Sequence, residues 1–488
     1  MIKSRAIVVL PPLLAVLALS PRSFPSPRPF PDTRDGIHVF YDQLPSWLSP
    51  AQWRFAAAHY AGCQKAVLSE VRTLRSHNPD FIVLHYQLGL GQGAWPFIDG
   101  EDWVQDWDHG LPNFRSYAGA GPVSDHDDWF VTWEASRVYQ NGWGWYVMDI
   151  TFDGDNPATG YPDYWLAACK EKMRRTECDG VFADSFTIDA YFGQVQSAHP
   201  WFNDISSCLA GWVPHLQAYA SYIRADFAAQ TEKFYFLPNL GALVTGWDAT
   251  DYASLGDGGM NEGFGEWGAG DYFDLSDWKL QMNRLLSLSR ADKILLLECN
   301  PPVENLSERM FLIGSYLLVK GSRTYITLSG AEVDCEWFPE YEIEIGGYLG
   351  DIPSDIDDLY VPSWGVYRRD YDDGFVLVNP SGTARQIAGL GGSFGLISAS
   401  GGGAVPENGL PVGNLSVSPV TALTLSAHAA AVLLRELDAD LNDDGVVDSR
   451  DFGILLSSWG DGGGRADLDG DGDVDRADAD LLIAQWSG

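Results

Sequence analysis

The sequence has few basic residues, with 31 Lys and Arg against 67 Asp and Glu and a formal net charge of −36 at pH 7. Such a negative field repels phosphate backbones and anionic lipid headgroups, which argues against nucleic acid and membrane surfaces as partners. The nine His residues form no HExxH or HxH pattern, so a barrel of the metallohydrolase kind lacks its ligands. The Walker-type phosphate loop is also missing.

After the N-terminal region, the sequence contains no apolar run long enough to span a bilayer. Residues 1–30 begin with the basic "MIKSR" and the apolar "AIVVLPPLLAVLALS", and a Pro-rich linker follows. This pattern predicts a secretory signal that is cleaved between about residues 18 and 30, with a retained N-terminal anchor as the alternative. We therefore expect a protein that is secreted, periplasmic or held at the cell surface.

Cysteine is sparse, with six residues in 488, and their spacing matches no zinc-binding pattern. In the oxidising compartment that export implies, they would form up to three disulfide bonds or none. We expect them to be structural in either case.

A chain of 488 residues predicts a large domain with smaller modules attached. Short β-branched or aromatic runs alternate with helical patterns, and eight such runs occupy residues 36–42, 80–87, 143–151, 179–186, 233–239, 258–265, 293–300 and 323–330. This alternation predicts an α/β fold, a (β/α)8 TIM barrel over residues 31–349. A doubly wound sheet is the alternative, but no Gly-rich phosphate loop follows the first run.

Three connecting regions complete this organisation. Residues 51–77 have the periodicity of one helix between the first two strands. Residues 88–142 are rich in Trp, Asp and Gly, which predicts a lid, a substrate-binding excursion or a hairpin insertion. Residues 350–436 lack amphipathic helices and contain Gly-rich turns, which predicts a small antiparallel domain of the β-sandwich type.

The C-terminal ends of barrel strands are where reactive groups of this fold stand. Cleavage of a glycosidic bond needs two carboxyl groups of different pKa, one as nucleophile or base and one as acid. Asp184 and Glu262 end the fourth and sixth predicted strands, and we expect Asp184 as nucleophile or base and Glu262 as acid/base. Glu298 is a rival for either role. For each of them, a carboxylate that caps a strand end is the alternative, and this alternative is stronger for Asp42.

Other polar or aromatic residues near the strand ends are candidates for contacts with a sugar substrate. Trp side chains stack on the C–H faces of sugar rings, although core packing is the ordinary role of any one of them. For His85 a structural hydrogen bond is favoured over a substrate contact, and for Asp149 a capping role is favoured. The candidate substrate-binding residues are His85, Tyr86, Asp149, Asn239, Asn261 and Trp145.

The acidic tail, residues 437–488, contains two repeats that align with an offset of 27 residues. Each repeat places oxygen-bearing side chains at alternating positions around a Gly, which is the spacing of a Ca²⁺ loop. When each loop is numbered from its first Asp, position 7 contributes a backbone carbonyl. Position 12 is Asp where a true EF-hand has Glu. A solvated acidic tail without metal is the alternative. The expected ligands of two structural Ca²⁺ ions are Asp440, Asn442, Asp444, Val446, Asp448 and Asp451 in the first loop, and Asp467, Asp469, Asp471, Asp473, Asp475 and Asp478 in the second.

The whole tail resembles a type I dockerin, an EF-hand-like α-helical module. This resemblance implies a Ca²⁺-dependent fold and a cohesin-bearing scaffold as partner.

The runs "DGVFADSF", "MNEGFG" and "LLLECN", together with "VYRRDYDDGFVLVNPSG", resemble the bacterial TIM-barrel enzymes of hypothetical glycosyl hydrolase family 15 over about residues 34–436. In better characterised barrels of the α-galactosidase type, the nucleophile ends strand four and the acid ends strand six. Carried over, these positions are Asp184 and Glu262, where Glu replaces the usual Asp. The resemblance implies a glycoside hydrolase acting on a poly- or oligosaccharide. A non-catalytic carbohydrate-binding barrel and a structural or adhesion protein are the alternatives.

Overall fold

The computed structural model describes residues 27–93, 126–151, 160–330, 334–435, 439–442, 444, 446–468 and 472–486. Its largest sheet pairs eight parallel strands in the order β10-β9-β3-β2-β1-β13-β12-β11. A parallel bridge between Asn239 and Met260 joins the two edge strands, so the sheet closes into the expected TIM barrel. The eight strands are β1 (Val39–Gln43), β2 (Tyr60–Gln64), β3 (Ile82–Leu88), β9 (Gly180–Asp184), β10 (Tyr235–Pro238), β11 (Gly258–Glu262), β12 (Ile294–Cys299) and β13 (Thr324–Leu328).

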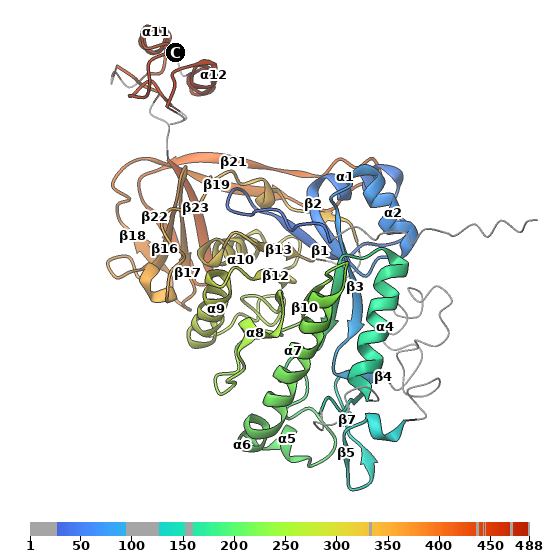
Figure 1. Ribbon diagram of the computed structural model, residues 1–488. Helices are drawn as coiled ribbons and strands as arrows, with labels where there is room; N and C mark the ends of the chain where they lie inside the picture. Colours follow the sequence, from blue (N-terminus) through green and yellow to red (C-terminus); the bar gives the residue numbers. More distant parts are fainter. Residues whose placement is uncertain are drawn as a thin grey trace, which may run out of the picture.

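Helices follow seven of these strands in the described part of the chain, and Figure 1 shows them around the barrel. They are α1 (Pro50–His59), α2 (Leu68–His77), α4 (Tyr161–Thr176), α7 (Val213–Ala229), α8 (Tyr252–Leu255), α9 (Leu275–Arg290) and α10 (Leu306–Val319). Short helical segments precede α7, namely α5 (Pro200–Asn203), α6 (Ile205–Ser207) and η4 (Cys208–Trp212).

The strand residues alternate between the inside of the barrel and the helix layer. Phe40, Tyr86, Phe182, Met260 and Leu296 belong to one buried cluster, which fills the barrel interior. Their sequence neighbours on the same strands belong to a second and larger cluster beneath the helices. This alternation decides which strand-end side chains reach the mouth of the barrel.

The prediction of one helix over residues 51–77 is wrong, because this segment contains α1, β2 and α2. The strand β2 is only five residues long and contains Ala, Gly and Gln, so its sequence carries little β signal. Its Gly62 is required by close packing, since a Cβ atom there would lie 2.5 Å from the carbonyl oxygen of Ile82 on β3.

The prediction that residues 143–151 form the third barrel strand is also wrong. They contain β8 (Trp145–Val147), which pairs antiparallel with β4 (Gly91–Gly93) and β7 (Tyr139–Gln140) in an insertion after β3. An alternating aromatic pattern is common to barrel strands and hairpins, so it does not distinguish them. The same insertion contains η2 (Asp127–Trp129), β5 (Thr132–Trp133) and β6 (Ser136–Arg137). The two errors offset each other, so Asp184 still ends the fourth barrel strand.

The C-terminal β-domain is built around an antiparallel sheet in the order β15-β16-β17-β23-β19-β21. A cluster that includes Phe375 and Leu425 lies between this sheet and the β18–β22 pair, and α10 packs against β17 and β23 (Figure 1). β14 pairs with β20, so this domain also uses residues before 350. Its elements are β14 (Glu336–Trp337), η5 (Pro339–Glu342), η6 (Ile356–Leu359), β15 (Tyr360–Val361), β16 (Val366–Tyr371), β17 (Gly374–Asn379), β18 (Arg385–Ile387), β19 (Phe394–Gly401), β20 (Gly403–Ala404), β21 (Gly413–Val420), β22 (Leu423–Leu425) and β23 (Ala429–Arg435).

Each repeat of the tail ends in a helix, α11 (Ser449–Ser457) in the first and α12 (Arg476–Ala484) in the second. Asp448 and Asp475 cap these helices, and both caps are completed by an Asp three residues later. Leu455 and Leu482 meet in a small core of the tail alone. The repeat seen in the sequence is therefore a repeat of structure.

All six cysteines are buried as free thiols, so the structure has no disulfide bond among them. Burial raises the pKa of every one of these thiols, which lowers their reactivity. None of the helices in the described residues is both long and apolar enough to cross a membrane. The predicted secretory signal and most of its linker, residues 1–26, lie outside the described residues.

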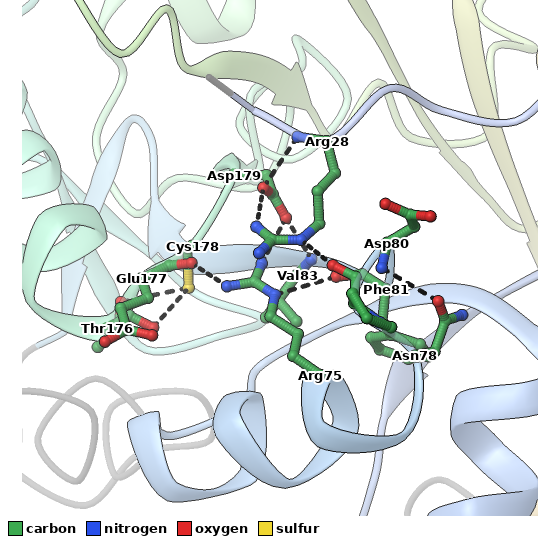
Figure 2. A network of polar contacts seen from close by, with 11 residues as sticks. Arg28, Arg75, Asn78, Asp80, Phe81, Val83, Thr176, Glu177, Cys178 and Asp179 are labelled. Atoms are coloured by element: carbon green, nitrogen blue, oxygen red, sulfur yellow. Dashed lines mark hydrogen bonds and ion pairs between the residues drawn. The ribbon is translucent and has the colours of Figure 1, made fainter. Parts of the chain in front are cut away.

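A buried ion-pair network closes the N-terminal end of the barrel (Figure 2). Asp179, which directly precedes β9, accepts hydrogen bonds from Arg28 at 3.0 Å, from Arg75 at 2.6 Å and from the backbone N–H of Val83 at 2.9 Å. Phe30 packs beside this network into the cluster inside the barrel. The linker residues from Arg28 onward therefore belong to the barrel, which begins before residue 31.

We predict that Asp179→Asn lowers the free energy of unfolding by about 3–5 kcal/mol, because it leaves two partly buried guanidinium groups without their anion. Urea denaturation followed by Trp fluorescence measures this loss. Asp80→Asn is the matched control, since Asp80 is an exposed carboxylate in the same region, and we expect a change within about 0.5 kcal/mol. Equal midpoints for the two variants would contradict the prediction.

Candidate active site

Four carboxylates stand at the C-terminal ends of barrel strands. Asp42 lies on β1, Asp184 ends β9, Glu262 ends β11, and Glu298 lies on β12. Glu262 and Glu298 are register partners on neighbouring strands, so their side chains leave the sheet side by side. Because the C-terminal ends of all barrel strands meet at one opening, the four acids lie at the same mouth of the barrel.

Asp184 is the acid with the most complete set of donors. The Tyr86 hydroxyl donates to its Oδ2 at 2.7 Å, while Asn239 Nδ2 and the backbone N–H of Ser185 donate to Oδ1 at 2.8 Å and 2.7 Å. Ser185 has a φ of 52°, a left-handed conformation that is strained for a non-Gly residue. This strained turn directs the N–H of Ser185 to the carboxylate, so three donors hold Asp184 in one orientation.

Asn239 connects the two acids predicted to carry out the chemistry. Its Nδ2 donates to Asp184 and also to Glu262 Oε2, the latter at 2.6 Å. The backbone N–H of Gly241 donates to Asn239 Oδ1 at 2.9 Å, which fixes the amide so that its nitrogen faces the acids. The prediction that Asn239 contacts substrate stays a prediction; its observed contacts are with the two carboxylates.

Loss of surrounding water, and then the negative charge of Asp184, raise the pKa of Glu262. Glu262 is exposed to solvent, although the protein around it removes part of its water. The hydrogen bond from Asn239 and the charge of Lys65 oppose the rise without cancelling it.

Burial and then the charges of Asp42, Glu262 and Asp184 raise the pKa of Glu298 well above its ordinary value. Lys65 again opposes this effect. Glu262 and Glu298 therefore hold protons more readily than free carboxyl groups do, while Asp184 is surrounded by donors.

Lys65 is a residue of the mouth that the sequence analysis missed. It directly follows β2, and its Nζ lies 2.6 Å from Asp42 Oδ2 and 5.3 Å from the centre of the Tyr86 ring. Gln64 also donates to Asp42. The sequence signal for Lys65 is its place at the end of the run "YAGCQK". This signal is lost when the run is assigned to a helix instead of to a strand.

Two residues predicted to bind substrate face away from the mouth. His85 precedes the inward-facing Tyr86, so it points into the helix layer, where burial and the charge of Lys172 lower its pKa well below the usual value. Asn261 lies beside the inward-facing Met260 and donates to the carbonyl oxygen of Gly241 at 2.6 Å. By the alternation of strand residues both side chains face the helix layer, and their part in substrate binding stays a prediction.

Two other predicted contacts lie in the insertion after β3. Asp149 accepts hydrogen bonds from the backbone N–H and the hydroxyl of Thr151, at 2.8 Å and 2.6 Å, so it caps a turn. Trp145 is buried and its indole N–H donates to Gln140 at 3.3 Å. Neither residue is among the groups that surround the four acids.

A second acid pair, Glu266 and Glu308, is buried beside the mouth, towards the β-domain. Burial, followed by the hydrogen bond and charge of Glu308, raises the pKa of Glu266 to about 8. Gly270 donates its N–H to Glu308 at 2.9 Å, and Asn305 donates at 2.5 Å. The bond from Gly270 to Glu308 joins the start of α10 to the loop after β11.

The model of one protein family, described as hypothetical glycosyl hydrolase family 15, matches residues 75–375. No curated protein matches the chain. Among solved structures, a mutant trehalulose synthase is 10% identical with a TM-score of 0.40, over 81% of this chain and 98% of the other. A protein from Thermus thermophilus is 13% identical with a TM-score of 0.39, over 82% and 99%. A Cryptosporidium parvum pyruvate kinase in complex with ADP is 11% identical with a TM-score of 0.31, over 61% and 64%. Scores at this level support no inference about activity.

We predict that Asn239→Ala raises the pKa of Glu262 by about one unit, because the variant removes a hydrogen bond that favours the ionised form. Water-soluble carbodiimide modifies protonated carboxyl groups, so the pH midpoint of labelling, followed by peptide mass spectrometry, measures the change. Asn261→Ala is the control, since this amide faces away from the acids. The same midpoint in wild type and Asn239→Ala would contradict the prediction.

Proposed function

Because the chain belongs to hypothetical glycosyl hydrolase family 15, we propose that it cleaves O-glycosidic bonds of an oligo- or polysaccharide with Asp184 and Glu262. Membership in the family makes it a glycoside hydrolase with a carbohydrate substrate. The observation that carries the assignment of residues is the amide of Asn239, which donates to both carboxylates at 2.8 Å and 2.6 Å. It holds two acids in unlike surroundings at the mouth of one barrel.

The two acids divide the chemistry according to their surroundings. Asp184, held by three donors, attacks the anomeric carbon. Glu262, whose pKa is raised, donates its proton to the leaving oxygen and then removes a proton from the attacking water. Glu298, which is also prone to hold a proton, is the alternative acid.

The spacing of the acids favours retention of the anomeric configuration. The two carboxylate oxygens bonded to Asn239 share one nitrogen, so they are separated by no more than about 5.5 Å, the separation found in retaining glycosidases. Inverting enzymes keep their acids about 6.5–9.5 Å apart to admit a water molecule between them. Asp184 therefore acts as a nucleophile rather than as a base for water.

The surroundings of the mouth favour a neutral sugar chain. Four carboxylates surround Lys65, so the local field disfavours uronic acids and other anionic sugars. Trp47, Trp143 and Trp267 are 75%, 58% and 61% exposed, and they follow the first, third and sixth barrel strands. Exposed indoles in the loops that follow barrel strands offer stacking surfaces for sugar rings.

For the tail we propose two Ca²⁺ ions and a cohesin as partner. In the second loop, Asp467 Oδ1 is buried and accepts no hydrogen bond from the residues that the structure describes, which fits a cation ligand. At position 12 of the loops, Asp451 and Asp478 are buried. Among the described residues no three His, Cys, Asp or Glu side chains converge as a metal site, and Asp469 and Asp471 lie outside that part of the chain. When bound, the ion would neutralise the loop carboxylates.

Export remains our proposal for the location of the protein. It is supported by the basic and apolar start of the sequence, by the attached tail module and by an acidic composition with a sequence pI of about 4.3. The six thiols are compatible with an oxidising medium, because all are buried.

We predict that Asp184→Asn lowers kcat on the cleaved glycan by on the order of 10³-fold or more, because the nucleophile is lost while the shape of the side chain is kept. Release of reducing sugar from a panel of neutral and acidic polysaccharides and short oligosaccharides measures the effect. Asp292→Asn, a change at the opposite end of the barrel, is the control and should retain activity. Equal rates for Asp184→Asn and wild type would move the nucleophile to another residue.

We predict that the full-length chain binds two Ca²⁺ ions and that Asp467→Ala binds one, because this substitution removes the first ligand of one loop. Isothermal titration with calcium chloride measures the number of ions. Asp461→Ala, in the exposed segment between the repeats, should keep both. Absence of calcium binding by the wild-type chain would show that the tail is a solvated acidic module.

A further inference from the structure

Lys65 is held in the mouth by an unusual local structure. Its backbone has a φ of 59°, in the left-handed region that non-Gly residues rarely adopt. Only 11% of its side chain and 14% of that of Asp42 are exposed. Strained residues of this kind persist where the surrounding structure holds them, and they gather at functional sites. The strain directs the ammonium group into the barrel instead of letting it extend into solvent.

The groups around this ammonium come from four strands. Asp42 of β1 forms the ion pair at 2.6 Å, and the charges of Glu298 on β12 and Asp184 on β9 also act on Lys65. In turn, the charge of Lys65 lowers the pKa values of Glu262 and Glu298, which the neighbouring acids raise. The ammonium thus acts on every acid of the mouth.

We propose that Lys65, fixed by Asp42, is a positioning residue that sets which acid of the mouth carries the catalytic proton. Among the described residues of the mouth four acids face one cation, so full ionisation would leave three negative charges uncompensated in a confined space. At least one proton must therefore remain in the mouth, and the placement of the cation decides where. Lys65 acts from the side of β1 and β2, where it pairs with Asp42, so the proton is left to Glu262 and Glu298.

Neutralising Lys65 and neutralising Asp42 should have opposite effects on the pKa values of Glu262 and Glu298. Lys65→Met removes a positive charge, so it should raise the pKa values of Glu262 and Glu298 by about one unit. Asp42→Asn removes a negative charge, so it should lower both. The double variant leaves the net charge of the mouth unchanged and should return both values towards those of wild type. Lys65→Arg keeps the charge and should preserve the wild-type values.

Carbodiimide labelling at a series of pH values, with peptide mass spectrometry, reads Glu262 and Glu298 separately in the full-length chain. This measurement needs no substrate, so it tests the electrostatic role of Lys65 by itself. The catalytic role of Lys65 rests on the proposed function. The second measurement is the pH profile of kcat/KM on whichever glycan the enzyme cleaves. Both limbs of the profile should move to higher pH in Lys65→Met and to lower pH in Asp42→Asn.

Unchanged labelling midpoints in Lys65→Met would overturn the proposal, even if activity falls, because they would leave Lys65 with a packing or substrate-contact role. Equal shifts in Lys65→Arg and Lys65→Met would also overturn it, since charge would then not be the cause. Shifted midpoints in an enzyme that cleaves no glycan of the panel would instead reject the proposed function and retain the electrostatic role of Lys65.

Discussion

Closure of the barrel between β10 and β11 is the constraint on which the site depends. The backbone N–H of Asn239 donates to Ala183 of β9 at 2.9 Å, and the next residue, Leu240, donates to Met260 of β11 at 2.8 Å. The side chain of Asn239 then repeats this connection one layer higher, between Asp184 and Glu262. Because the same residue closes the sheet and joins the acids, their separation is set by the backbone of three strands rather than by flexible loops.

Repulsion among the acids is the second constraint. Carboxylates gathered in a partly dry mouth cannot all ionise, so the structure has to assign each proton to a place. Donors surround Asp184, a cation faces Asp42, and Glu262 and Glu298 receive the weakest compensation. The proposed nucleophile and the proposed proton donor are thus residues of the same chemical type in different surroundings, as glycoside cleavage at neutral pH requires.

The sequence predicted the barrel and the acids at its mouth because strand-end acids are readable wherever a strand is apolar and flanked by helices. It failed at β2, whose Ala, Gly and Gln residues extend the helical pattern of α1, and Lys65 was lost with that strand. It also assigned His85 and Asn261 to the substrate, since one residue of register decides whether a side chain faces the mouth or the helices. Register depends on pairing with strands distant in sequence, and a local pattern does not contain it.

The two ends of the barrel use the same chemistry for opposite purposes. At the N-terminal end, Asp179 is buried with two guanidinium groups and a backbone N–H, so its charge is fully compensated and serves stability. At the C-terminal end, four acids and one ammonium meet among the described residues, and the deficit of positive charge raises the pKa values of Glu262 and Glu298. A second lysine at the mouth would compensate the acids more completely, but it would also lower these pKa values and so weaken the hold on the proton that the proposed acid Glu262 requires. The shortage of basic residues seen across the sequence is therefore, at this position, a condition of the chemistry.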